Sequence, residues 1–176
     1  MPFTPLHMGP GLAIKAVAGH RFSLLTFGIA QVVMDFEPLV GLVRGSPVLH
    51  GVTHTYLAAL LIALIAAIVA PLICRPILRR WNHELSFYRL DWLGAPEAWS
   101  VAPVVAGALV GTLSHVAFDS FMHSDITPLA PWSSSNSLLG LLSVATLHQL
   151  CVGAGLFGVL GWLVRGWLWR RVARLS

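Results

Sequence analysis

The chain has 176 residues, of which 56% are hydrophobic and 10% are charged, and its formal net charge is +4. A soluble domain usually carries about 25% charged residues, so this composition excludes an ordinary water-soluble protein and favours a bilayer as the solvent. The length suits one domain, residues 1–176, built from a few helices.

The first predicted element is a short apolar stretch at 8–19, which either inserts into the membrane or lies at its interface. Pro10 suits the first turn of a helix there. Four apolar runs that follow are long enough to cross a hydrocarbon core of roughly 30 Å: 22–43, 55–74, 98–122 and 137–164. The runs are continuous rather than alternating, which predicts helices and not strands. We therefore expect an all-α integral membrane bundle of four long spans plus a short N-terminal membrane helix.

The basic residues predict the orientation of this bundle. Only Arg44 lies on one side of the four spans, and ten others lie on the opposite side: Lys15, Arg21, Arg75, Arg79, Arg80, Arg89, Arg165, Arg170, Arg171 and Arg174. Cytoplasmic loops are enriched in Lys and Arg, so the side with ten residues and the C-terminus should be cytoplasmic. Because the excess charge follows the membrane topology, it does not indicate a nucleic-acid partner.

Acidic residues and histidines gather on the opposite, outer side of the predicted bundle. The acids lie at or just beyond the outer ends of the first and third long runs: Asp35, Glu37, Asp119 and Asp125. Four histidines fall on the same side: His50, His54, His115 and His123. A carboxylate within a span is costly unless it is paired or coordinated, so Asp35 and Asp119 need partners, and these histidines can supply them.

The spacing of these residues points to metal ligands. His50 and His54 are four residues apart, as are His115 and Asp119, and His123 follows four residues later. Residues at i and i+4 share a helix face, so each pair could grip one ion. Pro38, just after Asp35 and Glu37, would loosen the helix end and let both carboxylates turn inward. Mixed imidazole and carboxylate ligands suit zinc, manganese or iron.

Each part of this set also has an ordinary explanation. A lone His-x-x-x-His pair is often incidental, and an intramembrane Asp can serve helix packing or a proton relay. His123 can be an interfacial residue and Asp125 a helix cap. The joint occurrence on one membrane side favours metal binding. His148, near the middle of the fourth run, is expected to support the site, with a ligand role as the alternative.

Five motifs occur in a fixed order along nearly the whole chain: MPFTPLH at 1–7, MDFEPL at 34–39, HGVTHT at 50–55, SHVAFD at 114–119 and HSDITPL at 123–129. Their order and spacing resemble those of bacterial membrane-bound proteins described as metal-dependent hydrolases. The resemblance implies a multi-pass protein of the bacterial inner membrane, with its site toward the periplasm.

The pair His115-x-x-x-Asp119 also resembles a ligand pair of zinc-dependent phospholipase C and related nucleases. That likeness implies the following ligands: His7, Asp35, His50, His54, His115 and Asp119. The soluble enzymes use a second helical His-x-x-x-Glu pair, which Val152 interrupts here after His148, so one or two ions are implied rather than three. For His7 to reach the others, residues 8–19 must descend into the membrane and turn at His20, with Lys15 snorkelling to the cytoplasmic face.

The sequence therefore predicts a membrane-embedded, metal-dependent hydrolase. Its substrate would be a lipid or another amphiphilic phosphoester or ester at the outer membrane face. One or two divalent ions, with zinc expected and manganese or iron as alternatives, would activate water, and Glu37 or Asp125 would accept the proton. Two other functions use the same cluster. One is a membrane di-iron oxidase, which usually shows denser His-x-x-His-His motifs than this sequence has. The other is an ion- or proton-coupled transporter, which needs polar residues across the whole membrane depth, whereas most of them lie at one end here.

Overall fold

The computed structural model describes residues 5–95 and 99–173, with side chains to residue 168. All regular elements of these residues are helical. They are, in order, η1 (Pro5–His7), α1 (Met8–Ala18), η2 (Gly19–Arg21), α2 (Leu24–Met34), α3 (Phe36–Arg44), η3 (Val52–His54), α4 (Tyr56–Phe87), η4 (Asp91–Leu93), α5 (Val101–Met122) and α6 (Val144–Ala173). Within these described residues, four segments are long and apolar enough to cross a membrane: Leu24–Arg44, Tyr56–Phe87, Val101–Met122 and Val144–Leu168. The predicted all-α membrane bundle is confirmed.

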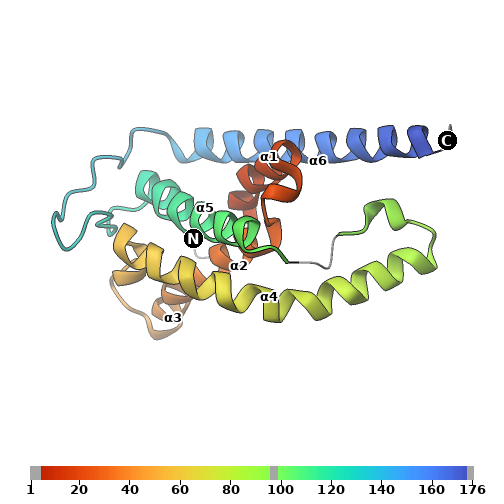
Figure 1. Ribbon diagram of the computed structural model, residues 1–176. Coiled ribbons are helices and arrows are strands. Elements are labelled where there is room, and N and C mark those ends of the chain that lie inside the picture. Colours follow the sequence, from red (N-terminus) through yellow and green to blue (C-terminus); the bar gives the residue numbers. More distant parts are fainter. Residues whose placement is uncertain (1–4, 96–98, 174–176) are drawn as a thin grey trace.

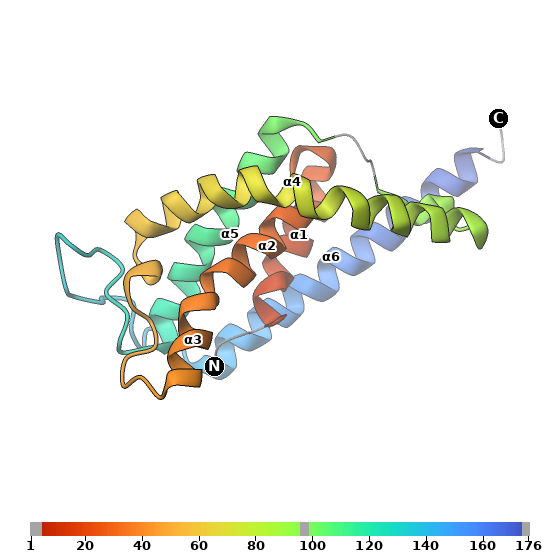
Figure 2. The ribbon, with the colours of Figure 1, turned by 90° about the horizontal axis from the view of Figure 1, so that it is seen from below.

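The helices form two groups that meet at α1. Helices α2, α4 and α5 pack against one another, and α1 packs along α6 and also contacts α2 (Figures 1 and 2). Gly9 of α1 lies against Cys151 of α6, and Gly19 lies against Arg165, so the two helices run in the same direction. Residues 8–19 thus lie within the helix bundle, beside α6.

The two ends of the bundle differ in chemistry. At one end α2 passes into α3, α4 begins, α5 ends and α6 begins, joined by the loops 45–55 and 123–143 (Figures 1 and 2). We call this the histidine end. The opposite end, toward which α1, α4 and α6 run, carries η2, η4 and most of the basic residues, and we call it the arginine end.

Several predicted helix boundaries are wrong. The run 22–43 is divided at Asp35. Helix α4 does not end at Cys74, as the run 55–74 predicted, but continues through Pro76 to Phe87. Helix α6 begins at Val144 instead of 137, which puts His148 near its start and not near the middle of a span. Hydropathy locates the apolar centre of a helix, whereas its ends depend on capping and local pairs. One such pair joins Arg80 Nε to Glu84 Oε1 at 2.9 Å, one helical turn apart in the unexpected part of α4.

Lys15 also differs from expectation. Its ammonium does not extend freely to the interface but donates a hydrogen bond to the carbonyl oxygen of Phe22, at 2.8 Å. This contact ties the end of α1 to the residue that follows η2, and so fixes the turn between α1 and α2.

Small residues let the helices approach closely, as is common where lipid replaces water around a bundle. A buried alanine cluster joins α2, α4 and α5: Ala30, Ala63, Ala66 and Ala108. A Cβ built on Gly107 of α5 would lie 2.3 Å from the carbonyl oxygen of Ser23. A Cβ on Gly158 of α6 would lie 2.4 Å from the carbonyl carbon of Leu12 in α1. The positions of α1 and α2 therefore depend on glycine in their partner helices.

The variant Gly158→Ala should destabilise the bundle, because its methyl group would collide with the backbone of α1. Overpacking of this kind costs about 1–3 kcal/mol of unfolding free energy. Gly153→Ala on the same helix is a matched control, since nothing lies within 4 Å of its added Cβ. Thermal unfolding in a mild detergent should separate the two variants. Equal unfolding temperatures would show that α1 does not pack on α6 in this way.

Candidate metal centre

The site begins on α5, where His115 and Asp119 lie one helical turn apart and are both buried. The Nε2 atom of His115 is 3.2 Å from Asp119 Oδ2. The same Nε2 is 3.5 Å from Oδ1 of Asp35, which occupies the break between α2 and α3. The break thus brings the carboxylate of Asp35 to the end of α5 that carries the histidine.

Two further histidines approach Asp119 from other parts of the chain. His54 Nε2 lies 3.4 Å from Asp119 Oδ2, and His7 Nε2 lies 3.7 Å from Asp119 Oδ1. His54 ends η3 just before α4, whose first turn is capped by the hydroxyl of Thr55. We call Asp35, His54, His115 and Asp119 the primary cluster. Its ligand atoms lie within 4.8 Å of one another, all four residues are buried, and His7 lies against them.

The histidine nitrogens around Asp119 are left without hydrogen-bond partners. Both ring nitrogens of His7 and the Nε2 atoms of His54 and His115 are buried and unpartnered. A buried polar atom that makes no hydrogen bond costs about 1–3 kcal/mol, so several together next to two carboxylates call for a shared partner. A metal cation satisfies lone pairs and carboxylates at once. This buried group of histidines and aspartates could hold a metal ion.

Gln31 fixes the orientation of His115. Its side-chain nitrogen donates to the carbonyl oxygen of Gly111 (3.1 Å), which leaves Oε1 of Gln31 facing His115 Nδ1 at 2.6 Å. Because an amide oxygen only accepts, Nδ1 of His115 must carry the proton. The lone pair is then on Nε2, the atom that faces both aspartates. Support of this kind is typical of metal-binding histidines.

His54 is oriented by a similar chain of hydrogen bonds. The backbone amide of Thr53 donates to Glu37 Oε2 at 2.9 Å, and the Thr53 hydroxyl donates to the same oxygen. The hydroxyl oxygen is then the acceptor for His54 Nδ1, 3.0 Å away. The proton of His54 is on Nδ1 and its lone pair on Nε2. Burial lowers the pKa of His54, which also favours the neutral, ligating form.

A second cluster, His50, His123 and Asp125, lies beside the first. Oδ1 of Asp125 is 2.9 Å from His50 Nδ1, and Oδ2 accepts hydrogen bonds from the backbone amides of Leu49 and His50. Burial raises the pKa of Asp125, but these hydrogen bonds outweigh it and lower the pKa to about 2. The rings of His50 and His123 stack with centroids 4.1 Å apart, and His50 is 4.9 Å from the ring of His54. An ionised Asp125 therefore holds His50 beside a residue of the primary cluster.

One sequence family matches this chain, a domain of unknown function called DUF4184, over residues 1–175. The chain belongs to this family. No curated protein and no solved structure matches it. The family description names no activity, so the likeness to metal-dependent hydrolases and to phospholipase C receives no support from this comparison.

In this DUF4184 member the predicted ligands fall into two groups. Five lie together around the carboxylate of Asp119, with Asp35 joined to the group through His115: His7, Asp35, His54, His115 and Asp119. The other two, His50 and His123, lie in the second cluster. The expectation that His50 and His54 share a helix face is wrong, because residues 45–51 form a loop and η3 is a single short turn. The pair His115 and Asp119 does share a face of α5, as its spacing predicts.

Glu37 and Asp125, predicted as general bases, lie outside the primary cluster. Each carboxylate is hydrogen-bonded on the Nδ1 side of a histidine, Glu37 through Thr53 and Asp125 directly. Sequence reasoning missed the two supporting residues, Gln31 and Thr53. Gln31 gave a usable signal, since it is a polar residue inside an apolar run, one helical turn before Asp35. Thr53 gave none, because threonine is ordinary in a loop.

Proposed function

We propose that this protein is a membrane-embedded, metal-dependent hydrolase that acts on a lipid or another amphiphilic phosphoester or ester. The observation that carries the proposal is the set of three buried, unpartnered Nε2 atoms around one carboxylate, Asp119. Supporting hydrogen bonds on the Nδ1 side of His54 and His115 favour ligation over a merely structural histidine cluster.

The donor set suits a divalent ion, with zinc as the expected one and manganese or iron as alternatives. His54, His115, Asp35 and Asp119 would hold it, with His7 as a further ligand. Such an ion would supply Lewis acidity and would lower the pKa of a bound water molecule toward neutral pH. The two aspartates offset the positive charge, so the buried site stays close to neutral.

The second cluster offers a proton acceptor. Asp125 accepts the Nδ1 proton of His50, which leaves Nε2 of His50 free to take a proton from water. The ring of His50 lies beside that of His54, so this base stands next to the primary cluster. We assign the base to His50, with Asp125 as its positioning residue. Glu37 is assigned a positioning role as well, since Thr53 occupies its carboxylate oxygen.

The place of the site in the bundle supports an amphiphilic substrate. The primary cluster lies at the histidine end, and the helices around it expose large apolar side chains such as Leu57, Leu60 and Leu61 of α4. By the distribution of basic residues, this end would face the outside of a bacterial inner membrane. Toward the arginine end, the buried residues of α4 are apolar, including Ala63, Ala66 and Ala70. The polar residues that a transport pathway needs are concentrated at one end, which favours hydrolysis over transport.

The function is tested by assaying the zinc-loaded protein in proteoliposomes against phospholipids and a soluble phosphodiester, with and without chelator. We expect chelator-sensitive hydrolysis. His50→Gln should lower kcat by about 10²–10⁴-fold while the bound metal is retained, as expected for loss of a general base. Exposed His20 lies at the arginine end, and His20→Gln should leave kcat unchanged. Oxygen consumption by an iron-loaded protein without any ester hydrolysis would favour the oxidase and contradict the proposal.

Loss of the amide that holds His115 should weaken metal binding. Gln31→Met keeps the length of the side chain but removes the acceptor for Nδ1, and such supporting contacts are worth about 10–100-fold in metal affinity. Competition with a chelating dye measures the change. Gln31→Glu retains an oxygen acceptor and should restore much of the affinity. Gln149→Met, at an exposed position on α6, is the control. Unchanged affinity in Gln31→Met would show that His115 is not a ligand.

A further inference from the structure

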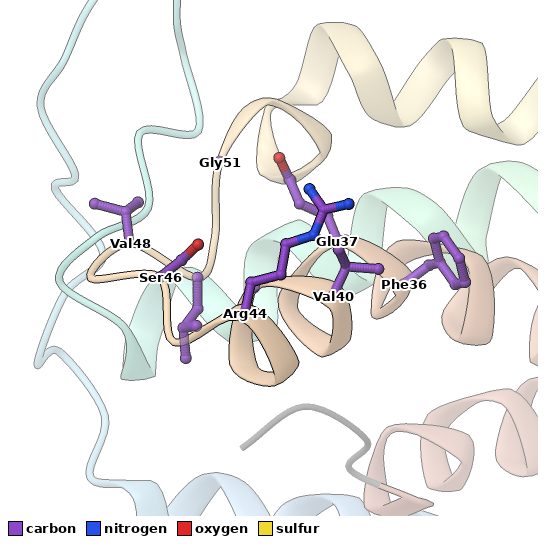
Figure 3. A pocket seen from close by; sticks show the side chains of 9 residues that line it. Phe36, Glu37, Val40, Arg44, Ser46, Val48 and Gly51 are labelled. Carbon is purple, nitrogen blue, oxygen red and sulfur yellow. The ribbon is translucent and has the colours of Figure 1, made fainter.

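A cavity of about 330 Å³ opens at the histidine end, between α3 and the loop that follows it (Figure 3). Its lining is mostly apolar, from Phe36, Val40, Val48 and Leu49. The polar side chains that line it are few: Glu37, Arg44 and Ser46. Several of its lining residues are exposed, so it is an open pocket at the surface. Apolar walls with a few polar groups are typical of ligand sites.

Arg44 and Glu37 are the two charged side chains that line the cavity. In the sequence Arg44 is the one basic residue on its side of the four predicted spans. Figure 3 shows its side chain extending along the cavity, on the same side as Glu37. None of the ion pairs found among residues 5–95 and 99–168 includes Arg44. The oxygen Oε2 of Glu37 is instead engaged by Thr53. Arg44 is exposed, and its guanidinium is therefore free to pair with a bound phosphate whose apolar chains lie against the neighbouring apolar wall.

The cavity is close to the primary cluster. Glu37, which lines it, lies 4.0 Å from His54 Nδ1, and the other ring nitrogen of His54 faces Asp119. Gly51 also lines the cavity, and His50 is the residue before it. A headgroup held here would therefore be separated from His54 by Glu37, and it would lie next to the residue that follows His50.

The surface beside the cavity suits acyl chains. Phe36 is 65% exposed and Val43 is 79% exposed, and both belong to α3 beside the opening. A cavity of about 330 Å³ accommodates a phosphate headgroup but not a whole lipid, so the chains would lie along this apolar face of α3. Arg44 in the cavity can thus pair with the phosphate, while the exposed apolar side chains of the adjacent α3 contact the acyl chains.

We propose that this cavity binds the headgroup of an anionic phospholipid, with the phosphate on Arg44 and the chains along α3. The inference rests on the proposed function, because it names the substrate class of that same site. Binding is nevertheless a property of the cavity itself and does not require a loaded metal centre.

Lipid retention by the purified protein tests the proposal. Native mass spectrometry of the full chain in detergent, titrated with phosphatidylglycerol or phosphatidylcholine, gives the apparent dissociation constants. Arg44→Gln should weaken phosphatidylglycerol binding about fivefold, the effect of one basic residue near an anionic lipid, and leave phosphatidylcholine unchanged. Arg44→Lys should retain most of the affinity. Arg80→Gln is the matched control, since Arg80 is exposed, is paired with Glu84 and lies on the distant half of α4.

Two results would overturn the proposal. One is equal retention of phosphatidylglycerol by Arg44→Gln and the unmodified protein. The other is displacement of the lipid by an equimolar amount of soluble glycerophosphate, which would mean that the cavity takes a free anion. Asp119→Asn should bind phosphatidylglycerol normally. If the unmodified, zinc-loaded protein binds phosphatidylglycerol but does not hydrolyse it, the proposed function is contradicted and the lipid site remains supported.

Discussion

Replacement of Asp119 by asparagine should abolish tight metal binding. Asp119 is the residue that His7, His54 and His115 all approach, and it supplies the carboxylate closest to their Nε2 atoms. An asparagine has the same shape but lacks the negative charge. Loss of a supporting contact already costs about 10–100-fold in metal affinity, so loss of a shared ligand should exceed about 100-fold. Competition with a chelating dye in detergent measures the affinity.

Asp91→Asn is the matched control for this experiment. Asp91 begins η4 at the arginine end and is exposed, so the variant should bind metal like the unmodified protein. A circular dichroism spectrum would show whether each variant keeps its helices. If folded Asp119→Asn binds metal as tightly as Asp91→Asn does, the primary cluster is not the metal site.

Removal of the metal should lower the thermal stability of the bundle. A ligand at about 1,000 times its dissociation constant stabilises the folded state by about 4 kcal/mol. In a chain of 150–250 residues, each kcal/mol shifts the unfolding temperature by roughly 2–4 °C, so chelation should lower it by about 10 °C. The physical cause is the loss of the shared partner of buried histidine nitrogens and two carboxylates. Differential scanning fluorimetry with and without EDTA, followed by excess zinc, measures the shift and its reversal.

Asp119→Asn again provides the internal reference, because a variant without the site should show no response to EDTA. A shift of the same size in this variant would mean that EDTA acts elsewhere on the chain. No shift in the unmodified, zinc-loaded protein would show that no buried metal contributes to its stability.

The sequence predicted the number and nature of the membrane helices but not their ends. Apolar runs long enough for a bilayer identified all four spans, because lipid exposure demands uninterrupted apolar side chains. The same signal cannot separate a helix that stops at Cys74 from one that continues through arginines and Pro76 to Phe87. Likewise, the break at Asp35 has no hydropathy signature. Its sequence signal is Pro38, which lacks the amide hydrogen that would bond to the carbonyl oxygen of Met34 four residues earlier.

The candidate site was predictable where ligands share a helix and less so where they lie in loops. The i, i+4 spacing of His115 and Asp119 places both on one face of α5, as expected. The same spacing in His50 and His54 suggested one shared ion, but the loop and η3 assign the two histidines to different clusters. The role of Asp125 as the partner of His50 joins residues 75 positions apart, which no local spacing reveals.

The metal content of the purified protein tests the central claim most directly. The unmodified chain, purified in mild detergent, reconstituted with zinc and freed of excess ion, should retain about one divalent ion per chain, as a single buried centre requires. Inductively coupled plasma mass spectrometry with a matched Asp119→Asn sample gives the stoichiometry. About two ions would contradict the assignment of His50 and Asp125 to proton transfer. No more metal than in Asp119→Asn would contradict the metal centre itself.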